Sequence, residues 1–536
     1  MNYGPVRKWS FPFQEKINIK TPVVRKVFFS LCSIIAVIFF VLFYGCFSSG
    51  TACIKSQVVV QSHYNFHKQN VADHSRNLGD SPSLETDEIS KVNHGPIFVK
   101  ELNVSVSNIA VRSEVLEVGE NETIDEDEEL FEEDDNLSSG SGIDNTTMGF
   151  EEIDWSDSRL DLLHMRKPDF DPRFKNPCWF EPLTSLNPYE NNTFTTFSPS
   201  SSRALETLAN HWRVNADTYG DAPTTATTRL RCLPYFLIIG QPKCGSTDLF
   251  WKIAKHPDIV TPPIKELHWW SRNRQGRRFN YMKLIPFSDY IDMFDNAGVR
   301  IYEKLLDYID DVDDDQIITG EASVSLFWDN GEWDRFPENM DQTQPRFIVP
   351  DYIHHFIPDV KLILILRNPV ERMYSDYLYF HSTNKSVDDF HEAVKDAVDL
   401  YSSCVQTNSP RQCVYDPALG NKARVRLRVG MYSVFLRDWL RLFPLSQFHI
   451  LRLEDYSREP VNYVKEVYRF LGLREIPSAR EKLLVTSSTS NVRKQSDRAL
   501  GDMLSETRAL LLQFYRPYNE ELAAMLSSKR YLWADS

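Results

Sequence analysis

Positive charge is absent from one long stretch in the first third of the chain. Overall, the 536 residues carry 60 Lys and Arg against 75 Asp and Glu, which gives a formal net charge of −15 at pH 7. Between Glu114 and Asp157 there are 18 acidic residues and no Lys or Arg, so this stretch accounts for the acidic excess. The rest of the chain is slightly basic, which is compatible with a polyanionic partner. We expect no nucleic-acid partner.

Hydrophobic periodicity is also absent from residues 48–169. This segment is polar, acidic and rich in Ser and Asn, as in EDEELFEEDDNLSSGSG. Such a composition buries too little apolar surface to offset the entropy of ordering, so we predict a flexible stem. The composition changes near Pro168, where aromatic residues and prolines appear (FDPRFKNPCWFEPL). We therefore predict a folded domain over residues 170–536.

Residues 27–47, VFFSLCSIIAVIFFVLFYGCF, contain no charged side chain. As a helix rising about 1.5 Å per residue, this run would span the roughly 30 Å hydrocarbon core of a membrane. The residues before the run include Arg7, Lys8, Lys16, Lys20, Arg25 and Lys26. The positive-inside rule then predicts a cytoplasmic tail over residues 1–26, a transmembrane signal-anchor over 27–47 and a lumenal remainder. A cleaved signal peptide is the weaker alternative, because the run exceeds a typical h-region.

Six glycosylation sequons lie on the predicted lumenal side, which is consistent with this topology. They begin at Asn103, Asn121, Asn136, Asn145, Asn191 and Asn384.

Cysteine is scarce, and five of the eight cysteines lie in the predicted folded domain. In an oxidising compartment we expect Cys404 to pair with Cys413 and Cys178 with Cys232, which leaves Cys244 as a free thiol. Sequence alone leaves other connectivities open. Cys53, just beyond the predicted membrane span, could cross-link a homodimer. No His, Cys and Asp cluster has metal-ligand spacing, so we expect no metal.

Short apolar runs alternate with helical periodicity from Arg231 onward. We predict strands over residues 235–239, 317–319, 361–366 and 448–453. We predict helices over residues 248–255, 370–380, 387–400, 432–442, 461–471 and 506–526. This alternation indicates an α/β fold with a P-loop-like parallel sheet flanked by helices.

The segment LPYFLIIGQPKCGSTDLFWKIAKHP reads as a buried strand, a glycine-bounded loop and a helix. Gly240 and Gly245 permit tight turns, and the amides at the start of the helix would point at an anion. Lys243 could neutralise charge on that anion. The spacing is not that of a Walker A loop, because Lys243 precedes Gly245. A purely structural turn is the alternative.

A second buried strand runs into a helix in KLILILRNPVERMYSDYLYF. Open α/β sheets bind ligands beyond the carboxyl ends of their strands, so Arg367 would face the same crevice as the first loop. A guanidinium with the hydroxyl of Ser375 would form a second anion clamp. Taken alone, Arg367 could equally be a solvated charge at the end of a strand.

Together, GQPKCGST and LRNPVERMYSDYLYF resemble the two signatures of the sulfotransferase superfamily that bind 3′-phosphoadenosine 5′-phosphosulfate (PAPS). The similarity continues through IKELHWWSRNR, GEASVSLFWDN, GMYSVFLRDWLRLFP, ILRLEDY and YRFLGL, and points to the carbohydrate sulfotransferases. The resemblance implies a PAPS-dependent sulfotransferase fold. It assigns the 5′-phosphosulfate to Lys243, Cys244, Gly245, Ser246 and Thr247. It assigns the 3′-phosphate to Arg367 and Ser375, with Arg493 and Lys494 of a C-terminal loop as weaker candidates.

The segment IKELHWWSRNRQGRR contains the candidates for acid–base chemistry. A sugar hydroxyl is a poor nucleophile, so its attack on sulfur benefits from a base. Glu266 is the main candidate, because it matches the base of heparan-type relatives, and His268 is the rival. Lys243 and Lys265 would stabilise charge on the departing phosphate.

Aromatic and basic residues follow this segment and are candidates for binding the acceptor. Trp269 and Trp270 could stack on sugar faces, although tandem tryptophans are as often core residues. Arg272 and Arg274 could bind sulfates or carboxylates. So could further basic residues, of which the last four would alternate on a strand before Gly430: Arg277, Arg278, Lys422, Arg424, Arg426 and Arg428. A solvated basic face is the alternative.

The resemblance implies transfer to a glycosaminoglycan, namely to the 6-hydroxyl of N-acetylgalactosamine 4-sulfate in chondroitin or dermatan sulfate. Heparan sulfate as the acceptor is one alternative, and an inactive glycan-binding membrane receptor is another. We expect a single-pass type II protein of the Golgi membrane with its catalytic domain in the lumen.

Overall fold

The computed structural model describes residues 162–218, 228–277, 284–307, 317–381, 385–476 and 493–534. The predicted tail, membrane span and most of the stem lie outside these residues, as do Arg278 and all predicted glycosylation sites except Asn191, which is exposed. Among the described residues no helix is long and apolar enough to cross a membrane. Leu162 is buried in the core, so packed structure begins before the predicted boundary at residue 170.

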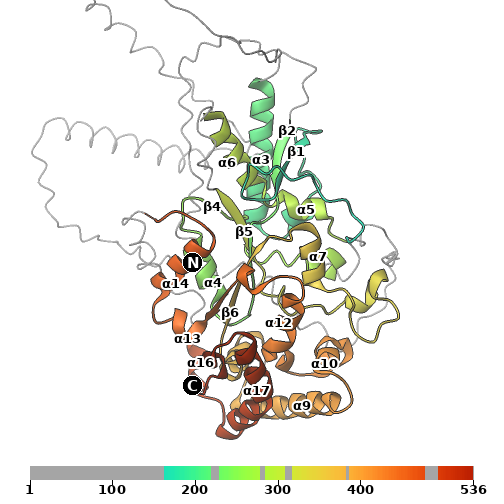
Figure 1. The fold of residues 1–536 in the computed structure, drawn as a ribbon, viewed down its shortest axis with the longest axis vertical. Coiled ribbons are helices and arrows are strands. Elements are labelled where there is room, and N and C mark those ends of the chain that lie inside the picture. Colours follow the sequence, from blue (N-terminus) through green and yellow to red (C-terminus); the bar gives the residue numbers. More distant parts are fainter. Residues whose placement is uncertain are drawn as a thin grey trace, which may run out of the picture. The chain divides into compact units, whose positions relative to one another are not determined.

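A five-stranded parallel sheet forms the centre of the fold, with the strand order β4-β5-β3-β6-β7 (Figure 1). Its strands are β3 (Phe236–Gly240), β4 (Ile259–Val260), β5 (Ile318–Ala322), β6 (Lys361–Leu366) and β7 (Phe448–Arg452). The first strand of this sheet along the chain, β3, lies in the middle, with β5 on one side and β6 on the other. Later strands are therefore added on both sides of β3, which makes it the topological switch point where open α/β sheets form their ligand crevice.

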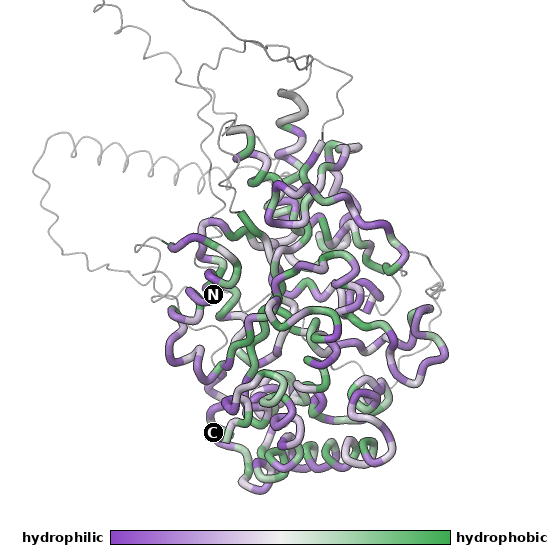
Figure 2. Tube along the Cα trace, in the orientation of Figure 1, coloured by the Kyte–Doolittle hydropathy of each residue, from purple (hydrophilic) through white to green (hydrophobic). Residues whose placement is uncertain are grey.

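Both faces of the sheet are covered, because side chains alternate between two hydrophobic clusters along each central strand. Leu237 and Ile239 of β3 join one cluster, whereas Phe236 and Ile238 join the other. Figure 1 shows α4 and α14 on one side of the strands and α7 and α12 on the other. In Figure 2 the strands form a hydrophobic centre between more polar outer segments. The burial on both faces explains why these strands read as continuous apolar runs.

The helices, in chain order, are α3 (Pro199–Thr218), α4 (Ser246–Ile253), α5 (Phe287–Asp292), α6 (Asp295–Asp307), α7 (Val349–Phe356), α8 (Pro369–Phe380), α9 (Val387–Val405), α10 (Pro410–Tyr415), α11 (Pro417–Lys422), α12 (Tyr432–Leu440), α13 (Leu453–Tyr456), α14 (Pro460–Phe470), α16 (Gln495–Ala499) and α17 (Ser505–Met525). The short 3₁₀ turns are η3 (Thr193–Thr196), η4 (Asn273–Gln275), η7 (Trp333–Arg335), η8 (Pro337–Asn339), η9 (Leu427–Gly430), η10 (Leu445–Gln447) and η11 (Lys529–Leu532).

The predicted α/β alternation is confirmed, with each of the four predicted strands and six predicted helices present within a few residues of its expected bounds. The strand predicted before Gly430 is wrong. Residues 422–430 instead comprise the end of α11, a short loop and η9. Val425, Leu427 and Val429 are buried in the core without joining the sheet, so the alternation of basic and apolar residues here reflects a loop and a 3₁₀ turn that pack one face inward.

Two disulfides form as predicted, and Cys244 is a buried free thiol. Cys178 and Cys232 link β1 (Cys178–Pro182) to β2 (Thr228–Cys232), which pair as a separate antiparallel ribbon. Cys404 and Cys413 link the end of α9 to α10.

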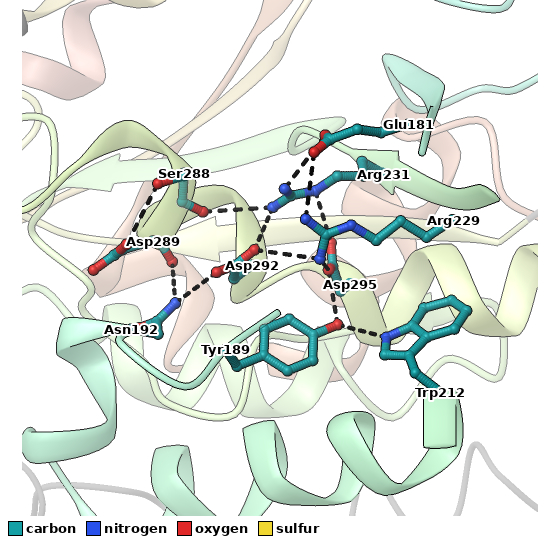
Figure 3. Close-up of polar contacts among 10 residues, drawn as sticks. All are labelled: Glu181, Tyr189, Asn192, Trp212, Arg229, Arg231, Ser288, Asp289, Asp292 and Asp295. Atoms are coloured by element: carbon teal, nitrogen blue, oxygen red, sulfur yellow. Dashed lines mark hydrogen bonds and ion pairs between the residues drawn. The ribbon is translucent and has the colours of Figure 1, made fainter. Parts of the chain in front are cut away.

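The ribbon is joined to α5 and α6 through a buried ionic network (Figure 3). Arg231 Nη2 lies 2.5 Å from Asp292 Oδ1, and Arg229 Nη1 lies 3.0 Å from Asp295 Oδ2. Tyr189 donates a 2.9 Å hydrogen bond to Asp295. Because buried charges are stable only when paired and hydrogen-bonded, this network fixes α5 against the ribbon.

Candidate active site

The loop after β3 is held by backbone hydrogen bonds to the neighbouring strand. Gln241 N–H donates to Ile365 O of β6 at 2.9 Å, and the buried Gln241 side chain donates to Val429 O at 2.9 Å. Lys243 has a positive φ of 63° and Gly245 one of 85°. A Cβ at Gly245 would lie 2.8 Å from Leu453, so both space and φ require glycine there.

Helix α4 starts directly after Gly245, and its first internal bond runs from Leu249 N–H to Gly245 O. The preceding amides therefore lie at the open N-terminus of a helix, where the dipole favours an anion. The predicted hydroxyls of Ser246 and Thr247 lie in this first turn and are largely buried. This geometry fits the phosphate cradle expected from the sequence.

Cys244 differs from that expectation. Its N–H donates to Gln241 O at 3.3 Å, within the loop itself. Its thiol lies in a hydrophobic cluster, and burial raises its pKa to about 12. The residue therefore supports the loop from the core side, and neither its amide nor its thiol is aimed at an anion.

The two sequence motifs meet at the carboxyl edge of the sheet. Arg367, which follows β6, donates from Nη1 to the Lys243 carbonyl at 3.3 Å. Ser375 lies partly exposed on α8, the helix that follows Arg367. The Lys243 ammonium lies 3.1 Å from the centre of the Tyr379 ring, on the last turn of the same helix. The predicted donor residues thus converge from two separate segments.

The candidates in the C-terminal loop differ in position. Arg493 lies over the Tyr374 ring, with its Cζ 5.6 Å from the ring centre, so it packs on the helix that carries Ser375. Lys494 is exposed at the start of α16. The position of Arg493 is the more compatible of the two with a 3′-phosphate contact.

Glu266 lies in a cluster with both of its predicted neighbours. Its Oε1 is in contact with the Lys265 ammonium, and its Oε2 lies 3.0 Å from His268 Nε2. Burial opposes ionisation of Glu266, but the charge of Lys265 and the hydrogen bond with His268 outweigh it and hold the pKa well below its usual range. The side chain is 15% exposed, so the carboxylate can still be reached from the crevice.

Both ring nitrogens of His268 are engaged. Nδ1 lies 2.6 Å from Ser325 Oγ, opposite the contact of Nε2 with Glu266. Burial lowers the pKa of His268, which keeps the imidazole neutral near pH 7. A histidine held at both nitrogens orients its neighbour, so the geometry favours Glu266 over His268 as the base.

Three of the candidate residues have a strained backbone. Glu266 and His268 have positive φ values of 65° and 49°, as does Lys243. Non-glycine residues rarely adopt this region, and such conformations cluster at active sites. The three residues predicted to carry the chemistry are therefore all held in unusual conformations by the surrounding structure.

A buried carboxyl behind this cluster was not among the predicted site residues. Glu321, at the end of β5, accepts hydrogen bonds from Tyr290 OH and Ser323 Oγ, and burial raises its pKa to about 7. Ser323 Oγ in turn accepts from His268 N–H at 2.9 Å. The polar residues of GEASVSLFWDN could have indicated that Glu321 and Ser323 support the site, because a strand end at this edge of the sheet faces the crevice.

The sugar-stacking role predicted for Trp269 and Trp270 does not fit the structure. Both indoles are fully buried, and Trp269 stacks on Tyr290 with a centroid distance of 5.2 Å. Arg274 is also buried, and its Cζ lies 4.3 Å and 4.0 Å from the Phe336 and Tyr352 rings. These three residues form part of the core, because the loop turns inward between α5 and α7.

Comparison with known proteins identifies the family to which this chain belongs. The family model of the sulfotransferase domain matches residues 233–510, which includes the phosphate loop, Glu266, Arg367 and Ser375. The chain belongs to the sulfotransferase family. It is accordingly a PAPS-dependent sulfotransferase, and the loop after β3 is the part of it that fits the donor phosphosulfate.

Individual sulfotransferases are similar over most of this chain. Carbohydrate sulfotransferase 15 of Homo sapiens is 41% identical over 392 residues, which cover 71% of this chain and 69% of that protein. The protein of the same name from Mus musculus gives the same values. Among solved structures, a sulfotransferase from Alicyclobacillus acidocaldarius covers 56% of this chain and 97% of its own, with 23% identity and a TM-score of 0.35, too low for any inference.

Proposed function

We propose that this sulfotransferase transfers the sulfuryl group of PAPS to the 6-hydroxyl of N-acetylgalactosamine 4-sulfate in chondroitin or dermatan sulfate. The observation that carries the proposal is the contact between Arg367 and the Lys243 carbonyl. It brings two anion-binding segments together at the edge of the sheet where the strained Glu266 also lies. The glycosaminoglycan acceptor is supported by the similarity to carbohydrate sulfotransferase 15.

The described residues fit the donor at both of its charged ends. The N-terminal amides of α4 and the Lys243 ammonium suit a phosphosulfate. Arg367, Ser375 and Arg493 suit the 3′-phosphate. When bound, PAPS supplies an activated sulfuryl group on a good leaving phosphate.

Residues of the chain itself have separate roles in the reaction. Glu266, ionised at neutral pH, accepts the proton of the attacking sugar hydroxyl. His268 and Lys265 hold the carboxylate in place. Lys243 stabilises the negative charge that accumulates at the departing phosphate, as preorganised cations do in phosphoryl transfer.

The cellular setting is part of the proposal. The uncharged run over residues 27–47, the basic tail before it and the sequons after it support a single-pass type II protein of the Golgi membrane, with the catalytic domain in the lumen. The two disulfides agree with an oxidising compartment. Cys53 would be available to link two copies of the chain.

The test is sulfate transfer from radiolabelled PAPS by the full-length chain, with chondroitin 4-sulfate and heparan sulfate as parallel acceptors. Disaccharide analysis of the product identifies the sulfated position. We expect a 4,6-disulfated N-acetylgalactosamine. Transfer to heparan sulfate alone would refute the acceptor, and glycan binding without nucleotide binding would indicate a receptor instead of an enzyme.

A further inference from the structure

Four arginines gather beside the candidate base, around the indole of Trp328. The Cζ atoms of Arg272, Arg426 and Arg428 lie 5.8, 5.7 and 5.6 Å from the centre of the Trp328 ring. Each is within the range of a cation–π contact, so three like charges converge on one ring. Arg277 joins the group through Asp329, which follows Trp328.

The cluster, defined as Arg272, Arg277, Arg426 and Arg428 around Trp328, contains more positive than negative charge. Asp329 pairs with Arg272 at 2.5 Å and with Arg277 at 3.6 Å. Asp376 pairs with Arg426 at 2.6 Å and is shared with the buried Arg372. Within the described part of the chain, Asp329 and Asp376 thus form ion pairs with four guanidinium groups, and Arg428 is not among them.

Arg428 has no carboxylate partner within the described part of the chain. Its Nη1 donates to the Val414 carbonyl at 3.3 Å, and its guanidinium packs against Gly420 of α11. The residue is only partly exposed. Arg428 therefore lacks an anionic partner among the described residues, and the oxygens of a bound anion would supply one.

The position of the cluster relates it to the reaction. On one side, the backbone N–H of Trp328 donates to the backbone carbonyl of Ser325, and the Ser325 hydroxyl holds the ring of His268 beside Glu266. On the other, the Arg426 guanidinium stacks on Phe380 at 3.8 Å, next to Tyr379, whose ring carries the Lys243 ammonium. The cluster is thus connected by direct contacts to the segment that carries the base and to the helix that carries the lysine's ring partner.

We propose that this cluster is an acceptor subsite that binds a sulfate ester already present on the sugar chain, with Arg428 as its main anchor. The proposal rests on the proposed function, which supplies an acceptor carrying sulfate groups. A guanidinium fork matches the oxygens of a sulfate ester, whereas a lysine offers only a point charge. The subsite would make prior sulfation a requirement for efficient transfer.

The test compares chondroitin 4-sulfate with chemically desulfated chondroitin, which keeps its carboxylates. For Arg428→Gln we expect KM for the sulfated acceptor to rise roughly 10- to 100-fold, as for a lost charge-assisted hydrogen bond. KM for PAPS and for the desulfated acceptor should stay unchanged. An equal loss on both acceptors would mean that the cluster binds a carboxylate and would overturn the proposal, as would no loss on either.

Two further variants control for charge and folding. Arg166→Gln removes an exposed arginine that pairs with Asp169 outside the cluster, and it should leave both acceptors unaffected. Gly420→Ala keeps every charge, but its Cβ would lie 2.6 Å from Arg428 Nη1 and so displaces the guanidinium. It should reproduce the selective rise in KM, with a thermal melt close to that of the unaltered protein; failure to do so in a folded variant would count against Arg428.

Direct binding separates this proposal from the proposed function. The affinity of the full-length chain for sulfated and unsulfated chondroitin tetrasaccharides can be measured by calorimetry without any turnover. If the unaltered protein transfers no sulfate to chondroitin yet binds the sulfated tetrasaccharide through Arg428, the function fails and the subsite stands. If transfer occurs but the sulfated tetrasaccharide has no advantage, the subsite fails alone.

Discussion

His268 Nε2 lies 3.0 Å from Glu266 Oε2 in a pocket where both residues adopt positive φ. The opposite nitrogen of the ring is held by Ser325 Oγ at 2.6 Å, and Ser271 Oγ lies 2.6 Å from the same hydroxyl. This chain of contacts fixes the tautomer and orientation of the imidazole. His268 therefore helps to orient the Glu266 carboxylate toward the crevice.

Removing the support behind the histidine should slow the reaction without affecting the donor. For Ser325→Ala we expect kcat to fall about 10-fold, as for one lost hydrogen bond of roughly 1.4 kcal/mol, with KM for PAPS unchanged. Steady-state kinetics measures both values. Ser505→Ala, at an exposed helix start, is the control and should have no effect. A rise in KM for PAPS in Ser325→Ala would place this serine in the donor site instead.

The ring of Tyr379 should preorganise the Lys243 ammonium, which lies 3.1 Å from its centre. Tyr379→Leu removes the ring face, and we expect kcat to fall roughly 3- to 10-fold, in line with the energy of a cation–π contact. Tyr379→Phe keeps the ring and should retain most of the activity. Equal losses in the two variants would show that the hydroxyl, and not the ring face, is the important group.

The buried carboxyl of Glu321 should make stability depend on pH. Burial raises its pKa from the ordinary 4.5 to about 7, so between these values the folded state keeps a proton that the unfolded state has released. Stability should therefore fall as pH rises from about 4.5 to about 7. Urea midpoints across this range should fall less steeply in Glu321→Gln, and an unchanged slope would contradict this assignment.

The two disulfides should differ in their contribution to stability. The chain-entropy model gives about 4 kcal/mol for a bond that closes 54 residues and about 3 kcal/mol for one that closes 9. The double substitution Cys178→Ser and Cys232→Ser should therefore lower the urea midpoint more than Cys404→Ser with Cys413→Ser. The reverse order would indicate that the β1–β2 ribbon contributes little to the folding unit.

Much of the fold could be predicted from the sequence because the parallel strands are buried on both faces. Continuous apolar runs such as KLILIL identify these strands directly, and the loops at their ends contain the residue types that bind phosphate. Alternation failed before Gly430, where Val425, Leu427 and Val429 are buried side chains of a loop and a 3₁₀ turn that have no strand partner. Alternation of polar and apolar residues alone cannot distinguish a strand from a buried loop when the neighbouring strand is unknown.

The candidate site was predicted less completely, because its support comes from distant segments. The contacts of Tyr290 with Glu321 and of Ser325 with His268 join positions that no local pattern relates. For the same reason the sequence left open whether Trp269 and Trp270 stack on sugars or belong to the core, since only the packing of α5 shows that both indoles are buried. Local motifs predict which residues carry charge, whereas tertiary packing decides which of them reach the crevice.

The most direct test of the account measures turnover and nucleotide affinity together in Glu266→Gln and Arg367→Ala. Glu266→Gln should bind the product nucleotide, 3′-phosphoadenosine 5′-phosphate, as the unaltered protein does, while kcat falls by the roughly 10²- to 10⁴-fold typical of a lost general base. Arg367→Ala should instead weaken nucleotide binding, because it removes a charge-assisted contact. If both variants lost nucleotide affinity to the same extent, the assignment of Glu266 as the base beside a separate donor site would be contradicted.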